Sequence, residues 1–285
     1  MQKKYYVVSA DIYLLMQEWA KQNDFVLPEK EFFVQLRKDF SSYMKGIFPA
    51  FEIVSEEEIS RGLADLVHES DLPVISLDRV YFKSELNLEI TRLVDEQRKD
   101  RGLGHRAGTP PIWQQIKKLQ MSGVHAAALV DDVIFTGGVL ERVIELLSRI
   151  NIRVKLICAG IAIGEGIARL GTKSEVRCVR TYQEVIDEVC ERDFYPGVPL
   201  SGRLVAGSQN VGVPYILPFG KPAIWASIPA QQTTDFSKFC IQQTMKLFAE
   251  IERASDKEIF CRNLGRKVVG LPLGAHYTDA LREIL

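Results

Sequence analysis

The chain has 285 residues, of which 46% are hydrophobic and 26% are charged, and its formal net charge is -1 at pH 7. This is the composition of an ordinary globular protein, and its near-neutral charge gives no reason to expect binding to nucleic acid or to an acidic membrane. We expect no transmembrane helix, because no run of about 18 apolar residues occurs. We expect no signal peptide either, because Asp11 interrupts the apolar start and no small-residue cleavage site follows.

The five cysteines do not form C-x-x-C pairs, and the four histidines do not cluster with them. This spacing argues against a structural zinc site and against a disulfide scaffold. We therefore expect buried, reduced cysteines and a cytoplasmic protein.

The first 94 residues contain alternating helical and strand-like patterns. Apolar residues recur at helical spacing in residues 11–22, 29–44 and 57–68. Two strand-like runs follow, at residues 73–82 and 86–94. Residues 1–45 are therefore predicted to form an N-terminal helical segment.

Residues 95–111 are predicted to be a loop, because they contain three glycines, two prolines and hardly any apolar side chain. The stretch is also basic, with Arg98, Lys99, Arg101 and Arg106 in it and Arg92 just before it. A loop of this length inside a compact domain is usually functional or disordered.

The clearest unit lies in the middle of the chain. Residues 124–130 are almost continuously apolar, residues 139–150 carry apolar side chains along one helical face, and residues 154–163 form a second apolar run. Strand, loop, helix and strand in this order are typical of a βαβ unit and a parallel sheet. Residues 175–182 are a candidate for a further strand.

From about residue 191 the sequence changes character and becomes rich in proline, glycine and aromatic residues, with a last helical pattern at residues 236–254. We therefore expect an α/β protein in three parts. These are an N-terminal helical segment (1–45), a parallel-sheet core (46–190) and a C-terminal accessory or hood segment (191–285).

Asp131 and Asp132 follow the buried run at 124–130, and Thr136, Gly137 and Gly138 come shortly afterwards. Ligands of open parallel sheets bind beyond the carboxyl ends of the strands. Two adjacent carboxylates need donors or a cation. A glycine turn before a helix offers N–H groups and a dipole that favour an anion. A phosphorylated sugar satisfies both the paired aspartates and the glycine turn, because its hydroxyls would donate to the aspartates and its phosphate would lie in the turn.

The stretch "ALVDDVIFTGGVL" resembles the signature of type I phosphoribosyltransferases, which bind 5-phosphoribosyl-1-pyrophosphate (PRPP). The resemblance implies a phosphoribosyltransferase-like core in which Asp131 and Asp132 contact the ribose hydroxyls, with Mg²⁺ alongside. It also implies that the 5-phosphate lies in the loop Phe135, Thr136, Gly137, Gly138, Val139 and Leu140. Val139 departs from the family, in which threonine is common at this position, and so removes one hydroxyl donor.

Other interpretations explain less of the pattern. A Rossmann-like strand end with a capped helix leaves the paired acids unexplained, and an acidic pocket of response-regulator or phosphatase type does not need the Thr-Gly-Gly turn. Residues 166–174, "GIARLGTKS", resemble a phosphate-binding P-loop but have Gly-Thr-Lys where Gly-Lys is required.

The resemblance also implies a basic catalytic loop before the signature, which would close over the substrate and exclude water. The stretch at 95–111 has this position, so Arg98, Lys99, Arg101 and His105 are the catalytic candidates. The pyrophosphate loop has two candidate positions, residues 53–62 and residues 76–85. In the second, Arg79 and Lys83 are candidates for contacts to pyrophosphate.

A planar base would need a stacking surface, for which the candidates are Tyr195, Phe219 and Trp225. The resemblance implies transfer of ribose 5-phosphate from PRPP to a base-like nitrogen with release of pyrophosphate, or the reverse reaction. The alternative is a regulatory protein that senses PRPP or a nucleotide without turnover. The expected partners are PRPP and a base or nucleotide, without membrane or nucleic acid, and a homodimer is left open.

Overall fold

The computed structural model describes residues 4–285 and has two compact units. Unit 1 comprises the described chain up to Ile53 together with Arg92–Gly102 and Ile186–Leu285, and unit 2 comprises Val54–Thr91 and Leu103–Val185. The chain therefore passes from one unit to the other four times, after residues 53, 91, 102 and 185. The expected N-terminal and C-terminal segments fall together in unit 1, and most of the expected core falls in unit 2.

Unit 2 is built on a five-stranded parallel sheet with the strand order β4-β3-β7-β8-β9. Its strands are β3 (Val74–Ser76), β4 (Leu86–Asn87), β7 (Ala126–Ile134), β8 (Arg153–Ile163) and β9 (Glu175–Tyr182). Its helices are α3 (Glu56–His68), α4 (Ile112–Gln120), α5 (Gly138–Ser148) and α6 (Gly164–Gly171). The predicted βαβ unit and the further strand at 175–182 are confirmed, and the chain is a mixed α/β protein with mostly parallel sheets.

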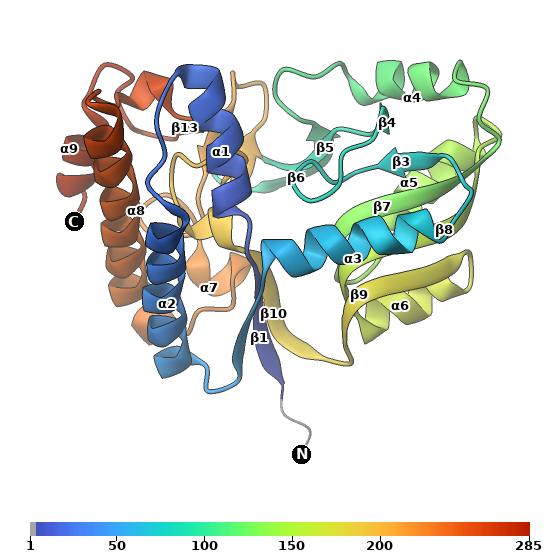
Figure 1. The fold of residues 1–285 in the computed structure, drawn as a ribbon, viewed down its shortest axis with the longest axis horizontal. Coiled ribbons are helices and arrows are strands. Elements are labelled where there is room, and N and C mark those ends of the chain that lie inside the picture. The colour runs from blue at the N-terminus through green and yellow to red at the C-terminus, as the bar shows by residue number, and fades with distance from the viewer. Residues whose placement is uncertain (1–3) are drawn as a thin grey trace. The chain divides into compact units, whose positions relative to one another are not determined.

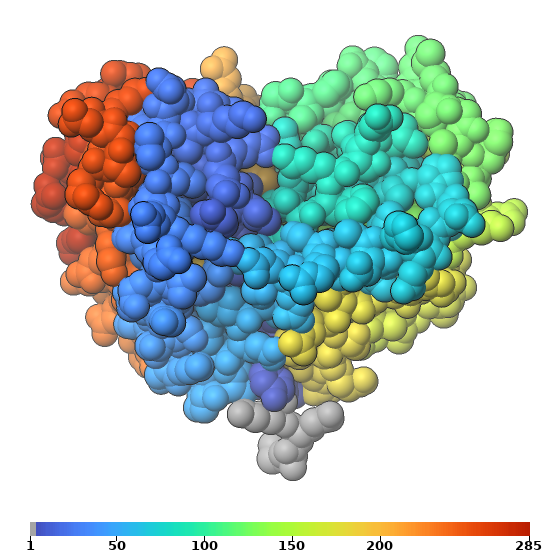
Figure 2. All heavy atoms as spheres, viewed as in Figure 1, coloured from blue at the N-terminus to red at the C-terminus, as the bar shows by residue number. Residues whose placement is uncertain are grey.

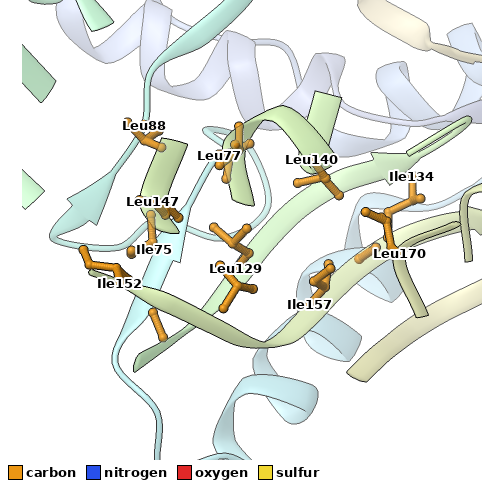
Figure 3. Packing of buried hydrophobic residues seen from close by; sticks show 14 of the residues in the cluster. Ile75, Leu77, Leu88, Leu129, Ile134, Leu140, Leu147, Ile152, Ile157 and Leu170 are labelled. Atoms are coloured by element: carbon orange, nitrogen blue, oxygen red, sulfur yellow. The ribbon is translucent and has the colours of Figure 1, made fainter. Parts of the chain in front are cut away.

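Helices cover the apolar surface of this sheet. Figure 3 shows Leu129 of β7 and Ile157 of β8 on neighbouring strands, with Leu140 of α5 and Leu170 of α6 in the same buried cluster. Helix α3 runs along β8 and β9 (Figure 1), and its outer side forms part of the surface in Figure 2. The long apolar runs of β7 and β8 follow from this arrangement, because a central strand of a covered parallel sheet has no solvent-facing side.

Two further sheets have the strand orders β10-β1-β2 and β13-β12-β11-β5-β6, and most of their residues belong to unit 1. The strands are β1 (Tyr5–Ser9), β2 (Phe51–Val54), β10 (Val185–Cys190), β5 (Ile90–Val94), β6 (Asp100–His105), β11 (Arg203–Val205), β12 (Val211–Val213) and β13 (Lys267–Val268). The helices are α1 (Ile12–Asn23), α2 (Lys30–Ile47), α7 (Pro222–Trp225), α8 (Thr233–Ser255) and α9 (Tyr277–Arg282).

The core of unit 1 is strongly aromatic. Phe40 of α2 lies 5.7 Å from Phe194, measured between ring centroids, and Phe194 lies 5.1 Å from Phe236 of α8. Phe248 of α8 packs at 4.7 Å against Tyr277 of α9. Such ring pairs add to the apolar burial that holds an aromatic core together, and here they join the N-terminal and C-terminal parts of the chain.

The predictions for the first 111 residues need four corrections. The run at 86–94 is two strands, β4 and β5, which belong to different sheets. The N-terminal segment begins with strand β1 before its helices. The strand-like run at 73–82 is a strand only over Val74–Ser76, because Asp78 turns the backbone by accepting hydrogen bonds from the residues after it. The predicted loop at 95–111 contains strand β6, which follows β5 in one sheet.

In the described part of the chain, none of the helices combines the length and the apolar character needed to cross a membrane.

Candidate functional site

Strand β7 carries both aspartates and is longer than predicted. Its partner β3 ends at Ser76, opposite Val130, whereas β7 continues beside β8 as far as Ile134. Asp131 and Asp132 therefore lie within the strand, at the step where β3 has ended, and do not follow the strand as predicted. At this step β7 keeps its pairing with β8 on one side, whereas its pairing with β3 on the other side has ended.

The two carboxyl groups interact directly. The Asp132 N–H donates to Asp131 Oδ1 at 3.0 Å, and the charge of the Asp132 carboxylate acts on Asp131. Burial raises the pKa of Asp131 well above its ordinary value, and the charges of Asp132 and Asp78 raise it further. A cation or hydroxyl donors nearby would stabilise the ionised form of such a buried carboxyl group.

The Thr-Gly-Gly loop leads directly into α5. Gly137 has φ +76°, a conformation that glycine adopts without strain, and its carbonyl accepts the first helical hydrogen bond from the Glu141 N–H at 2.9 Å. Thr136 is exposed, and its hydroxyl lies 3.5 Å from the Gly138 nitrogen. The first N–H groups of a helix have no partner within the helix, so this loop presents donors and the positive end of a helix dipole.

Helix α6 packs closely against this loop, which the sequence pattern did not indicate. A Cβ at Gly166 would lie 2.5 Å from the Phe135 carbonyl oxygen, so only glycine permits this approach. The approach brings Arg169 to the loop, with its Nη1 atom 3.4 Å from the position of a Cβ on Gly138. Arg169 was missed because it lies on the helix after the next strand, and only the packing of α6 connects it with the site.

The charge of the first turn of α5 is balanced. Glu141 lies in this turn, where its carboxylate would repel a phosphate, but Lys173 contacts it at 2.8 Å. The hydrogen bond from Lys173 lowers the pKa of Glu141, and Arg169 adds to the effect. The ion pair therefore offsets the one acidic side chain of this turn and leaves the loop suited to an anion.

The loop after β3 lies beside the aspartates. Its Asp78 is only 6% exposed and accepts hydrogen bonds from the N–H groups of Val80, Tyr81 and Phe82, at 2.8, 2.7 and 2.6 Å. Burial and the charge of Asp132 raise the pKa of Asp78 to about 6. Three carboxyl groups from neighbouring strand ends therefore act on one another here.

Of the two candidate positions for a pyrophosphate loop, residues 76–85 form this loop, whereas residues 53–62 comprise the end of β2 and the first half of α3. Arg79 is 44% exposed and lies 3.6 Å from Glu89. Lys83 is in the same loop and is exposed. Contacts of Arg79 and Lys83 to pyrophosphate stay a prediction.

The catalytic candidates lie on the β5–β6 hairpin. Arg98 occupies its turn with φ +61°, Lys99 bonds through its backbone to Asp95, and Arg101 forms an ion pair with Asp95 at 3.2 Å. Asp95, Arg98, Lys99 and Arg101 belong to unit 1. His105, at the end of β6, belongs to unit 2, and its Nδ1 lies 3.1 Å from the Arg106 carbonyl oxygen. Their catalytic roles stay predictions.

The candidates for base stacking all lie in unit 1. Tyr195 has no exposed surface and Phe219 is 3% exposed, so neither ring presents a face to a base. Trp225 is 9% exposed, and the Arg203 guanidinium covers its ring at 4.5 Å from the centroid. The aromatic residues of this stretch contribute to the core of unit 1, and a base platform at Trp225 would require Arg203 to move.

The fit of the site to Mg²⁺ depends on its donor set. Among residues 4–285, no three acidic, histidine or cysteine side chains are grouped so that they could hold a metal ion. The Asp78 carboxylate accepts hydrogen bonds from the backbone N–H groups of Val80, Tyr81 and Phe82, which leaves Asp131 and Asp132 as possible ligands. Mg²⁺ usually keeps several waters and takes one or two carboxylates together with substrate oxygens, so this pair fits an ion that arrives with a substrate.

No family model and no curated protein matches this sequence. Among solved structures, UMP synthase of Leishmania donovani is similar at 12% identity and a TM-score of 0.28, over 46% of this chain and 28% of that chain. Orotate phosphoribosyltransferase of Mycobacterium tuberculosis, in complex with inorganic phosphate, is similar at 12% identity and a TM-score of 0.26, over 43% and 68%. The protein TT1426 of Thermus thermophilus has 16% identity and a TM-score of 0.27, over 44% and 80%. At these values the likenesses do not establish a family.

Proposed function

We propose that the chain is a Mg²⁺-dependent, cytoplasmic phosphoribosyltransferase that transfers ribose 5-phosphate from PRPP to a base-like nitrogen and releases pyrophosphate, or runs in reverse. The observation that carries the proposal is the combination of two features at one edge of a parallel sheet. Asp131 and Asp132 lie at the step beside β3, and the Gly137–Gly138 turn follows at the start of α5.

In the proposed reaction the ribose hydroxyls donate to Asp131 and Asp132, and the 5-phosphate accepts from the first N–H groups of α5. Bound Mg²⁺ would neutralise charge on the leaving pyrophosphate. Arg169 adds a cation beside the loop that holds the phosphate. The protein then acts by holding the reacting carbon in position and by charge, without a covalent nucleophile.

Titration calorimetry with ribose 5-phosphate, PRPP and nucleoside monophosphates, each with Mg²⁺, tests the binding half of the proposal. Release of pyrophosphate from PRPP with pooled bases tests turnover. Binding with turnover for at least one acceptor is the expected result. If ribose 5-phosphate, PRPP and the nucleoside monophosphates all fail to bind at millimolar concentration, the proposal is wrong.

A second candidate function, sensing of PRPP or a nucleotide without turnover, is favoured by the loop after β3. The backbone N–H groups of Val80 to Phe82 already bond to Asp78, so they are not available to a leaving group in this conformation. Binding of PRPP without pyrophosphate release under any acceptor would support the sensor.

A further inference from the structure

The loop after β3 contains an anion-binding arrangement that holds an anion of its own. The N–H groups of three successive residues, Val80, Tyr81 and Phe82, converge on the carboxylate of Asp78 at 2.6–2.8 Å. Successive N–H groups that point to one spot form a nest, a backbone arrangement that binds phosphate and similar anions in many proteins. Here the carboxylate of Asp78 occupies the nest.

The rest of the loop holds this arrangement closed. The Ser76 hydroxyl lies 3.0 Å from the Asp78 carbonyl oxygen and 2.9 Å from that of Phe82, so it joins the two ends of the turn. Arg106 donates to the Leu77 carbonyl at 3.2 Å and pairs with Glu89 at 3.2 Å. The loop therefore has a defined shape around the nest.

A charged side chain is a costly choice for a purely structural turn at this place. Asp78 is almost fully buried, and the charge of Asp132 acts against its ionised form. An asparagine or serine has only one acceptor oxygen, whereas these bonds use both oxygens of Asp78, Oδ1 for Val80 and Oδ2 for Tyr81 and Phe82. A carboxylate, like a phosphate, is an anion that accepts charge-assisted hydrogen bonds on more than one oxygen.

We propose that Asp78 is an internal competitor for diphosphate, which fills the subsite for the leaving group and makes the resting site select ribose 5-phosphates without a diphosphate. This inference rests on the proposed function, because it places the leaving-group subsite beside the ribose site. PRPP would bind fully only after Asp78 leaves the nest, whereas ribose 5-phosphate or a nucleoside monophosphate would bind without this step.

The size of the effect follows from the population of the open nest. When only a fraction of molecules can bind a ligand, the apparent affinity is reduced by that fraction. If the nest is open in about one molecule in ten or fewer, removal of the carboxylate raises diphosphate affinity about tenfold or more.

The test uses the full chain, with Mg²⁺ constant and inorganic pyrophosphate and ribose 5-phosphate as separate probes in calorimetry. Asp78→Ala is expected to bind pyrophosphate about tenfold or more tightly than the wild type, with ribose 5-phosphate affinity changed less than about twofold. Asp71→Ala is the matched control, because it makes the same change at an exposed position between α3 and β3, outside the loop. Its pyrophosphate affinity is expected to stay near that of the wild type.

An unchanged or weaker pyrophosphate affinity in folded Asp78→Ala would overturn the inference, as would an equal gain in Asp71→Ala. If Asp78→Ala does not fold, Asp78→Asn replaces it, because it keeps the size of the side chain and one acceptor oxygen. This variant must also gain pyrophosphate affinity. If ribose 5-phosphate fails to bind even the wild type, the proposed function fails, but a pyrophosphate gain on loss of Asp78 would still support the internal anion.

Discussion

Asp131→Asn is expected to change ligand binding and folding stability in opposite directions. For binding, the variant loses a charged acceptor for a ribose hydroxyl, and hydrogen bonds to charged groups contribute about 1.5–3 kcal/mol. The dissociation constant for ribose 5-phosphate is therefore expected to rise roughly 10- to 150-fold. Calorimetry at fixed Mg²⁺ measures this change.

For stability, the same substitution removes a charge that the folded state disfavours. Burial, Asp132 and Asp78 raise the folded-state pKa of Asp131 above its ordinary value of 3.8. The folded state then binds more protons than the unfolded state between these two pKa values, so wild-type stability falls as the pH rises from about 4 through the folded pKa. Asp131→Asn lacks this loss and should be more stable at neutral pH, by about 0.5–2 kcal/mol.

Thermal unfolding of wild type and variant at several pH values measures the second effect, which corresponds to about 2–4 °C per kcal/mol for a protein of this size. Asp65→Asn is the control, because Asp65 is exposed on α3 and the change is chemically the same. Undiminished binding by Asp131→Asn would refute the site assignment. A variant that is less stable than the wild type at neutral pH would refute the electrostatic account of the aspartate cluster.

Three further substitutions test the packing and charge described above. Gly166→Ala places a Cβ 2.5 Å from the Phe135 carbonyl oxygen, in the loop before α5, so it should destabilise the fold by about 1–3 kcal/mol and weaken ribose 5-phosphate binding. Thermal unfolding and calorimetry measure the two effects. In the control Gly171→Ala the new Cβ meets nothing within 4 Å, so neither effect is expected. Arg169→Gln should weaken ribose 5-phosphate binding about three- to tenfold at low salt and less at high salt, because the Arg169 side chain is 42% exposed and salt screens exposed charges. Equal affinity of variant and wild type at low salt would contradict a role of Arg169 in phosphate binding. Asp11→Ala leaves the Arg192 guanidinium without its fully buried partner and should cost about 3–5 kcal/mol in urea unfolding; a cost below about 1 kcal/mol would contradict the importance of the pair.

The parts of the fold predicted well from sequence are those whose signal is local. Strands β7 and β8 are buried on both faces, so their apolar runs identify them without knowledge of the neighbours. Helix α5 and its glycine turn follow from periodicity and from the conformational freedom of Gly137. The same local pattern placed the paired aspartates at the carboxyl edge of the sheet.

The parts predicted poorly depend on partners far away in the chain. Strand β6 is polar and contains two glycines, and it is ordered within a sheet that includes β11, about 100 residues later. The Asp78 nest was hidden because its hydrogen bonds need backbone N–H groups turned inward, which side-chain patterns do not reveal. Arg169 reaches the loop before α5 only because Gly166 permits the close approach of α6.

The four passages of the chain between its units set an order of events during synthesis. Unit 2 has all of its residues once Val185 has been made, whereas unit 1 still lacks Ile186–Leu285. At the usual rates of translation, about 5–20 residues per second, this interval lasts about 5–20 s. During that time the site proposed for ribose can form on its completed sheet, whereas α1 and α2 still lack the aromatic side chains of α8 against which they pack. A nascent chain stalled far enough beyond Val185 for that residue to have left the ribosome should therefore already bind ribose 5-phosphate, before the other unit can fold.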